Sequence, residues 1–269
     1  MHRHTADVEG ERLGWYEEGE GEPVVFVHGI PTGPQLWRRV VPLVAGRCLA
    51  WEMLGYAESI DEAADRDISV AAQADRLLRW LDALDVERAI LVGHDLGGGV
   101  AQIAAVKAPQ RWTGLVLTNA IAYHSWPIPS VKAMRAAGPL VERIPASMFR
   151  PVFDRFVRAG HDDAATATES ARLHWQPYGA HGGPAAFVRQ IRSLRTQDTL
   201  AVADELATLD VPAQIVWGAA DQFQKLSYGE RLARDLRAPI TRLDGARHFV
   251  PEDHPQAVAT AVGELLRTG

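Results

Sequence analysis

Leu91-Val-Gly-His-Asp-Leu-Gly-Gly98 joins a short apolar run to a segment with the spacing of a helix. Residues 93–97 fit the pattern Gly-x-nucleophile-x-Gly of a sharp strand-to-helix turn, with Asp95 at the position of the nucleophile. Such a turn is strained, so the flanking Gly93 and Gly97 must lack bulky side chains. A helix N-terminus favours a carboxylate, so we expect Asp95 to be ionised at neutral pH. The alternative is that Asp95 only caps the helix.

Short apolar runs alternate with helical patterns on both sides of this turn. We expect strands at residues 12–17, 23–27, 48–51, 89–92, 114–118, 213–217 and 238–243. We expect helices at residues 35–44, 69–85, 97–107, 226–236 and 255–267. Continuous apolar runs are typical of strands that are buried on both faces. The alternation therefore predicts an α/β fold in which helices cover both faces of a parallel sheet.

One long segment interrupts the alternation. Between residues 123 and 199 we find no convincing strand, and helical spacing recurs at residues 131–141, 146–159, 163–175 and 184–194. A helical insertion into an α/β sheet suggests a cap over the active edge of the sheet. We therefore predict a core domain of residues 1–122 and 200–269 and a helical cap of residues 123–199.

The composition is that of a globular protein with a large core. Of the 269 residues, 47% are hydrophobic and 23% are charged. A net charge of −6 and the lack of a basic run argue against nucleic-acid binding. The single Cys48 excludes an internal disulfide and a cysteine-built zinc site, and the histidines do not have metal-binding spacing. We expect neither a metal nor a cofactor.

The sequence also argues against a membrane protein. The longest stretch without charged residues, 114–131, contains polar residues and two prolines, which a membrane span would disfavour. The N-terminal residues lack the apolar segment of a signal peptide. We expect a soluble, cytoplasmic protein that acts on a small molecule, and the sequence leaves its oligomeric state open.

Three further loops follow predicted strands. Residues 27–32, Val-His-Gly-Ile-Pro-Thr, end the strand at 23–27, while Asp221 and His248 lie just after two later strands. Ligands of α/β sheets bind at the carboxyl ends of the strands, so we expect these loops to meet near Asp95. The order of nucleophile, acid and histidine along the chain is that of a hydrolase triad.

Over nearly its whole length the chain resembles the α/β-hydrolase superfamily. Its Gly-His-Asp-Leu-Gly-Gly turn at 93–98 resembles the branch of epoxide hydrolases and haloalkane dehalogenases. The resemblance implies a mostly parallel eight-stranded sheet flanked by helices, with a helical cap inserted after the sixth strand. It also implies that an aspartate attacks carbon and forms an alkyl-enzyme ester, which water then hydrolyses.

The resemblance assigns a role to five residues. Asp95 would be the nucleophile, His248 the base that activates water, and Asp221 the acid that orients the imidazole. The backbone N–H groups of Ile30 and Leu96 would form the oxyanion hole.

Several positions depart from the relatives in this branch. Haloalkane dehalogenases often bind the halide through a tryptophan after the nucleophile and an asparagine in the preceding loop, where this chain has Leu96 and Ile30. Fluoroacetate dehalogenases carry arginine at the position of Leu96. Glu52 stands where the superfamily usually has aspartate. Some dehalogenases take their acid from the end of the sixth strand, but residues 118–120 include no carboxylate, which favours Asp221 over the alternative Asp244.

The leaving group separates the alternatives. An epoxide oxygen needs O–H donors, and the cap offers Tyr123 and Tyr178; a halide needs N–H donors, and the cap offers Trp126 and Trp175. Because both usual halide donors are missing, we favour an epoxide hydrolase for a small hydrophobic epoxide. A haloalkane or haloacid dehalogenase is the first alternative. A non-catalytic protein that binds a small ligand on this fold is the second.

Overall fold

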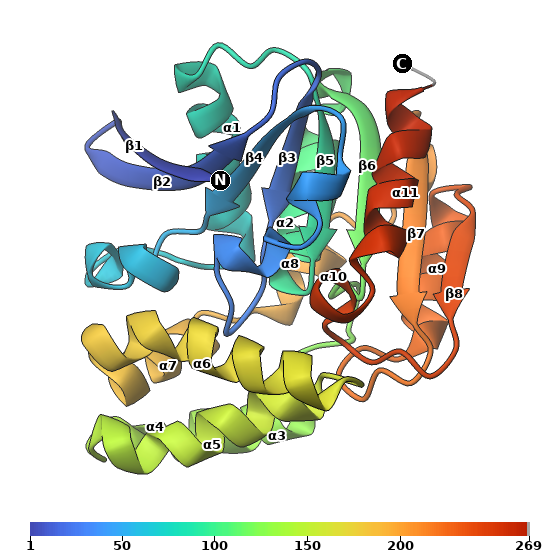
Figure 1. Cartoon of the computed structure of the whole chain (residues 1–269). Coiled ribbons are helices and arrows are strands. Elements are labelled where there is room, and N and C mark those ends of the chain that lie inside the picture. Colours follow the sequence, from blue (N-terminus) through green and yellow to red (C-terminus); the bar gives the residue numbers. More distant parts are fainter. Residues whose placement is uncertain (268–269) are drawn as a thin grey trace.

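The computed structural model describes residues 1–267, in which eight strands form one sheet (Figure 1). The strands are β1 (His2–Val8), β2 (Glu11–Glu18), β3 (Pro23–Val27), β4 (Arg47–Glu52), β5 (Ala89–His94), β6 (Trp112–Thr118), β7 (Ala213–Gly218) and β8 (Ile240–Leu243). Their order is β1-β2-β4-β3-β5-β6-β7-β8, and only the pairs β1–β2 and β2–β4 are antiparallel. The predicted fold class is therefore confirmed.

The central strands coincide with the apolar runs of the sequence. In β3, residues 24–27 have no exposed surface, and β5 is buried at every position. The edge strand β1 was not predicted, because most of its residues are exposed and polar. It is held by its pairing with β2, from His2 opposite Glu17 to Val8 opposite Glu11. An edge strand that has one neighbour and faces water carries little of the hydrophobic pattern on which prediction depends.

Helices lie on both faces of the sheet, and a further group of helices lies beyond one end of its strands (Figure 1). The α-helices are α1 (Val70–Ala83), α2 (Leu96–Lys107), α3 (Pro129–Ala136), α4 (Gly138–Val141), α5 (Ala146–Ala159), α6 (Ala164–Ala180), α7 (Gly183–Arg192), α8 (Thr196–Leu200), α9 (Leu226–Asp235), α10 (Val250–Asp253) and α11 (Pro255–Leu266). Short 3₁₀ helices occur at Pro34–Trp37, Val41–Leu43, Ala57–Ser59, Asp61–Ala63, Pro109–Arg111 and Leu206–Thr208.

Two predicted helices are broken where proline interrupts the pattern. The helix expected at 35–44 is two 3₁₀ turns, because Pro42 has no N–H to continue an α-helix from the first turn. The helix expected at 131–141 is divided into α3 and α4, and Pro139 lies at the start of the second. Proline is accommodated in the first turn of a helix, where the N–H has no partner in any case.

Helices α3 to α7 form a layer below the sheet in Figure 1, at the end toward which β3 and β6 point. The layer has an aromatic core of its own. Phe153 packs against Trp175 and Tyr178 at ring distances of 5.2 and 5.1 Å, and Phe149 packs against Phe187 at 5.5 Å. The division at residues 123 and 199 into a cap and a core stays a prediction.

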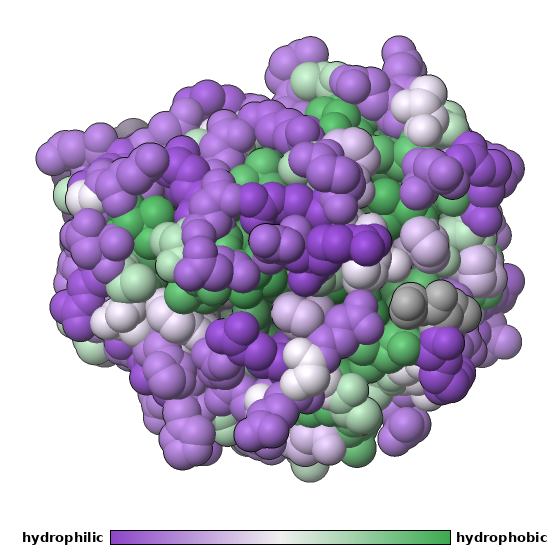
Figure 2. Space-filling model, turned by 90° about the horizontal axis from the view of Figure 1, so that it is seen from above, coloured by the Kyte–Doolittle hydropathy of each residue, from purple (hydrophilic) through white to green (hydrophobic). Residues whose placement is uncertain are grey.

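The face shown in Figure 2 is largely hydrophilic, with smaller hydrophobic areas between the polar groups. Within residues 1–267, no helix combines the length and the apolar character that crossing a membrane requires.

Candidate active site

Asp95 lies in the tight turn between β5 and α2. Its backbone has φ 51° and ψ −119°, a conformation that is strained for a residue with a side chain. The glycines around it are required by close contacts. A Cβ atom on Gly29 would lie 2.4 Å from the Asp95 Cβ, and one on Gly97 would lie 2.1 Å from the Val27 carbonyl oxygen. The Asp95 side chain makes no capping hydrogen bond to α2, so the alternative of a simple helix cap is wrong.

Two backbone N–H groups face the Asp95 carboxylate. The Ile30 N–H donates to Oδ2 at 2.9 Å. Burial raises the pKa of Asp95 to about 6, while His248 and the N–H groups of Ile30 and Leu96 act in the opposite direction. Asp95 is thus mostly ionised at pH 7, as expected, although its pKa is higher than a helix N-terminus alone would suggest.

His248 lies between two carboxylates. Its Nδ1 is 2.8 Å from Asp221 Oδ2, and its Nε2 is 3.9 Å from Asp95 Oδ1. Burial works against a charged imidazole, but Asp221 and Asp95 raise the pKa of His248 above its ordinary value. Burial likewise opposes the charge on Asp221, whose pKa is nevertheless lowered by His248 and by hydrogen bonds from Asn119 and Phe223.

The structure places Asp221, and not Asp244, beside the histidine. Asp244 is largely exposed and pairs with Arg242. Sequence reasoning missed Asn119, whose Nδ2 donates to Asp221 Oδ2 at 2.7 Å and whose Oδ1 accepts from the Gly218 N–H at 3.2 Å. Asn119 directly follows β6 but carries an amide, so a pattern that looks for a carboxylate at this position does not indicate its role as a hydrogen-bond donor to the acid.

A cavity of about 40 Å³ adjoins Asp95 and His248. Its walls are mostly apolar and include Ile30, Leu96, Ile121, Ile128, Phe156 and Phe223. Gln224 is a polar exception that sequence reasoning missed. Its side-chain amide makes no hydrogen bond to any part of the chain that the structure describes, and its Oε1 is buried. The signal in the sequence is a second amide three residues after the predicted acid, in Asp221-Gln-Phe-Gln224.

Two of the four predicted cap residues come from the segment after β6. The Tyr123 hydroxyl donates to Asp235 Oδ2 at 2.6 Å, under the guanidinium of Arg231, and Tyr123 does not line the cavity. Trp126 does line the cavity, but its Nε1 donates to Thr199 Oγ1 at 2.7 Å. In this structure, neither the phenol nor the indole N–H is therefore available to a leaving group.

The other two cap residues belong to the aromatic core of the helical layer. The Tyr178 hydroxyl donates to Gln190 Oε1 at 2.6 Å. Trp175 packs edge-on against Phe153, with the Arg150 guanidinium 5.2 Å from its ring centre. Neither residue lines the cavity at Asp95, and their positions on α6 serve packing of the layer.

Another buried carboxylate lies four residues after His248. Glu252, on α10, accepts hydrogen bonds from Arg38, from Ser170 at 2.6 Å and from His174 Nε2 at 3.2 Å. Its Oε2 is also 3.4 Å from His161 Nε2. Because Ser170 and His174 belong to α6, Glu252 joins the segment after the last strand to the helical layer. We call Glu252 and these four partners the Glu252 cluster.

His28 and His94, which flank the site, have structural surroundings. Burial lowers the pKa of both His28 and His94 to about 3, so both are neutral near pH 7. His28 Nε2 accepts a hydrogen bond from the Met53 N–H at 3.2 Å. No group of three or more potential metal ligands occurs within residues 1–267.

Residues 22–255 match the family described as alpha/beta hydrolase fold. The chain belongs to the α/β-hydrolase family, and it is an enzyme of the hydrolase class.

Two curated relatives cover nearly the whole chain. A haloalkane dehalogenase from Sphingobium indicum is 33% identical over 97% of this chain and 94% of its own length. A 2-hydroxymuconate semialdehyde hydrolase from Pseudomonas sp. strain CF600 is 30% identical over 96% of this chain and 91% of its own length.

Solved structures agree in fold. An alpha/beta hydrolase fold protein from Burkholderia ambifaria has a TM-score of 0.85 and 27% identity, with 97% of each chain covered. The epoxide hydrolase CorEH has a TM-score of 0.76 and 17% identity, with 99% of each chain covered. At this identity the second similarity concerns the fold alone.

Proposed function

We propose that the protein hydrolyses carbon–halogen bonds of small hydrophobic haloalkanes through an ester on Asp95. The observation that carries the proposal is the asymmetry of the Asp95 carboxylate. Oδ2 accepts from the Ile30 N–H, whereas Oδ1 is 3.9 Å from His248 Nε2, beyond hydrogen-bond distance. Oδ1 is thus the oxygen available for attack in a mostly apolar cavity.

The reaction has two steps. In the first, Asp95 Oδ1 forms a bond to the substrate carbon while the carbon–halogen bond breaks and halide leaves. In the second, His248 Nε2 takes a proton from water, and the oxygen of that water attacks Asp95 Cγ. The N–H groups of Ile30 and Leu96 stabilise the oxyanion, and Asp221 stabilises the imidazolium. Collapse breaks the bond between Asp95 Cγ and the alkyl oxygen, which takes the proton from His248 and leaves as the alcohol; the remaining proton on Asp95 is lost to water, which restores the carboxylate.

The choice of halide over epoxide depends on the donors at the cavity. The hydroxyls of Tyr123 and Tyr178 donate to Asp235 and Gln190, which removes the support for an epoxide. The amide of Gln224 lines the cavity and offers N–H groups that suit a halide. The name of the Sphingobium relative supports the same chemistry.

Trapping the ester tests the proposed chemistry. His248→Gln should release one equivalent of bromide from 1-bromobutane and then stall, with the protein heavier by one butyl group in its mass spectrum. In wild-type protein, a single turnover in ¹⁸O-water should leave label in Asp95. His2→Gln, at an exposed histidine whose side chain makes no hydrogen bond or ion pair within residues 1–267, is the matched control and should turn over normally.

The outcomes separate the alternatives. Label in the alcohol alone would mean direct attack by water and would overturn the ester mechanism. Diol from 1,2-epoxybutane without bromide release from 1-bromobutane would assign an epoxide hydrolase. No turnover of any substrate in a wider panel, with binding intact, would favour the non-catalytic alternative.

Gln224→Leu tests the donor to the halide. We expect bromide release to fall about 10²- to 10³-fold, the usual effect of removing one donor from developing negative charge. Gln110→Leu, at an exposed amide outside the cavity, should leave the rate unchanged. Equal rates for both variants would remove Gln224 from the mechanism.

A further inference from the structure

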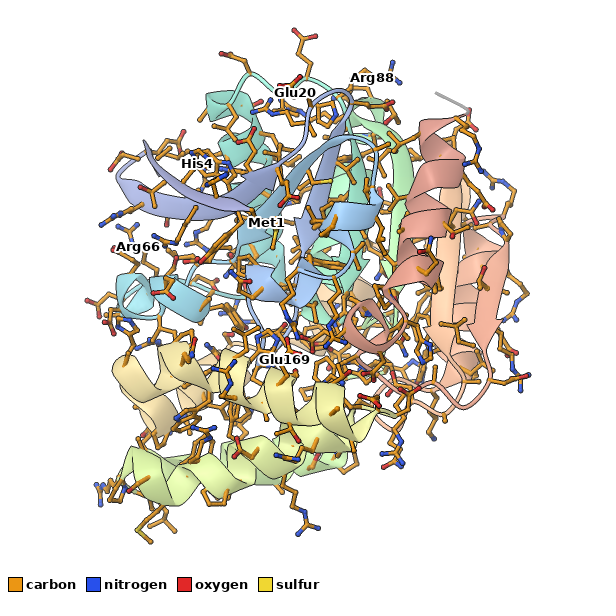
Figure 3. The ribbon with its side chains drawn as sticks, viewed as in Figure 1. Met1, His4, Glu20, Arg66, Arg88 and Glu169 are labelled. Carbon is orange, nitrogen blue, oxygen red and sulfur yellow. The ribbon has the colours of Figure 1, made fainter. Side chains whose placement is uncertain are left out.

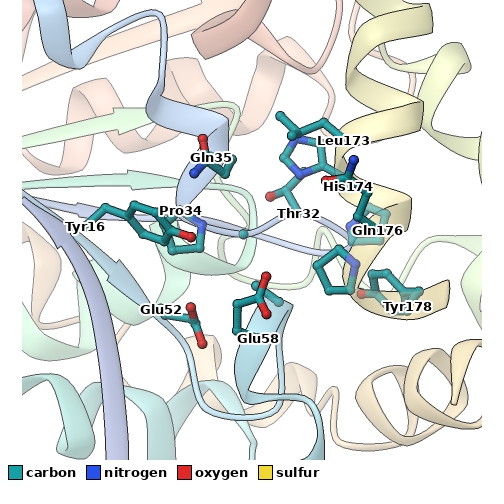
Figure 4. A pocket seen from close by; sticks show the side chains of 14 residues that line it. Tyr16, Thr32, Pro34, Gln35, Glu52, Glu58, Leu173, His174, Gln176 and Tyr178 are labelled. Atoms are coloured by element: carbon teal, nitrogen blue, oxygen red, sulfur yellow. The ribbon is translucent and has the colours of Figure 1, made fainter. Parts of the chain in front are cut away.

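A second cavity lies between helix α6 and the loop that follows Ile30 (Figure 4). Its volume is about 210 Å³, compared with about 40 Å³ for the cavity at Asp95. Residues 31–35, the ends of β2 and β4 and the last turns of α6 form its walls. Asp95, Asp221 and His248 do not line it, so the proposed reaction makes no use of this space.

Glu52, at the end of β4, gives this cavity a buried negative group. The residue has no exposed surface, and its Oε1 accepts hydrogen bonds from Ser59 Oγ and, at 3.4 Å, from the Arg3 guanidinium, with which it forms an ion pair. Its Oε2 has no hydrogen-bond partner within residues 1–267. Burial raises the pKa of Glu52. A buried carboxylate oxygen without a donor is unfavourable, so a donor brought by a ligand would stabilise the charged form.

The other polar groups at the cavity also favour a cation. The carboxylate of Glu58 acts electrostatically on Glu52, and Figure 4 shows both side chains on the side of the cavity opposite Gln35. The aromatic ring of Tyr16 is a further wall. No lysine or arginine is among the lining residues, and the Nε2 of His174 is turned to Glu252.

We propose that this cavity binds a small organic cation of the alkylammonium type. The ammonium N–H groups would donate to Glu52 Oε2 and Glu58, and the hydrocarbon part would lie against Pro34, Pro177 and Leu173. An aromatic face such as that of Tyr16 also attracts a cation. A metal ion fits less well, because no group of three or more metal ligands is found in the described chain.

Calorimetric titration with n-butylammonium chloride tests the site, with butan-1-ol as the neutral probe of similar shape. We expect saturable one-to-one binding of the ammonium and binding at least about 10-fold weaker for the alcohol, because a hydrogen bond to a charged group is stronger. Glu58→Gln and Glu52→Gln should each weaken ammonium binding by about 10-fold or more. Glu87→Gln, at an exposed carboxylate outside the cavity, should not.

Two controls keep the result decisive. Glu58 is exposed, so Glu58→Gln should fold even if Glu52→Gln does not. Asp95→Asn removes the charge from the other cavity and should leave ammonium binding unchanged. The proposal is overturned by equal binding of ammonium and alcohol, by the absence of saturable binding, or by loss of binding in Asp95→Asn alone. The assay needs no turnover, so its failure and that of the proposed function are distinguishable.

Discussion

Asp95 and Glu252 are both buried carboxylates that lie between the sheet and helices α3 to α7, but their surroundings differ. Asp95 has a hydrogen bond from the Ile30 N–H on one oxygen, and its other oxygen is 3.9 Å from His248. Burial therefore dominates and raises the pKa of Asp95 to about 6. One oxygen of this group is left free to react.

Glu252 has donors on both oxygens. Burial would raise its pKa as well, but His174 and Arg38 lower that pKa to about 2. The comparison shows that burial alone does not make a carboxylate reactive. The number and charge of its partners decide whether it serves chemistry, as we propose for Asp95, or holds segments together, as Glu252 does.

The largest expected effect is on turnover. Asp95→Asn should lower the rate on a haloalkane by more than about 10⁴-fold, because no other group can form the ester. Glu252→Gln should leave the rate per folded molecule within about 10-fold of wild type. Steady-state kinetics on both variants, with the exposed Asp244→Asn as control, measure the difference. Comparable losses in the two variants would contradict the division of roles.

Stability should show the reverse order. Glu252→Gln removes the buried anion that Arg38 and His174 share, and breaking a buried pair costs about 3 to 5 kcal/mol. Asp95→Asn keeps the shape and removes a charge that burial disfavours, so we expect no loss of stability. Urea unfolding of the two variants at neutral pH measures the free energies. A larger loss in Asp95→Asn than in Glu252→Gln would refute this assignment.

Acid should affect the two groups in opposite directions. The pKa of Glu252 is about 2 in the folded chain and 4.5 ordinarily, so its stabilisation is complete above pH 4.5 and lost as pH falls toward 2. The loss is about 3 kcal/mol. The pKa of Asp95 is about 6 against an ordinary 3.8, so its contribution to stability rises as pH falls between those values.

The same pKa of Asp95 predicts the pH dependence of ester formation. Only the ionised carboxylate attacks, so the rate of bromide release in a single turnover should fall as pH drops below about 6. In His248→Gln the midpoint should move upward, because His248 lowers the pKa of Asp95. Unfolding curves across the pH ranges of both pKa values test the predicted changes in stability. Rapid-mixing kinetics on both sides of about pH 6 test the rate of bromide release and its midpoint. An unchanged or lower midpoint in the variant would contradict this electrostatic account.

The smallest effect is expected for Glu169, a partly exposed carboxylate outside the Glu252 cluster that pairs with Arg38 of that cluster. Glu169, labelled in Figure 3 on α6, pairs with Arg38 and Arg39, but 41% of its side chain is exposed. Exposed ion pairs contribute about 0 to 1 kcal/mol, so Glu169→Gln should barely change stability. Comparing its unfolding curve with that of Glu252→Gln tests whether the free energy of unfolding depends on the burial of a carboxylate or on the number of its ion pairs. A loss of stability close to that of Glu252→Gln would favour the number of ion pairs.

The sequence predicts those parts of the molecule in which local pattern and tertiary role coincide. Strands β3 and β5 are buried on both faces, and their apolar runs indicate this directly. The order of Asp95, Asp221 and His248 predicts their meeting, because each follows a parallel strand. The prediction of one helix at 35–44 was wrong because it depended on the apolar spacing there, although Pro42 interrupts the helix.

The hydrogen-bond partners of the predicted cap donors could not be predicted, because these partners are far away in the sequence. Tyr123 pairs with Asp235, and Trp126 with Thr199, and no spacing within the cap indicates either contact. The role of Gln224 depends on a cavity formed by several segments. Residue type identifies a possible donor, but only three-dimensional placement shows whether it already donates a hydrogen bond to another group.

The position of Glu252 four residues after His248 has a consequence for synthesis on the ribosome. Asp95 emerges first and the helical layer follows, but the histidine that faces Asp95 and the anion that binds α6 leave the exit tunnel only after both of them. A chain that stops before residue 248 carries the aspartate without its base and the layer without its anchor. Domains begin to fold during synthesis from the N-terminus. Assembly of the site and attachment of the layer therefore become a single late event.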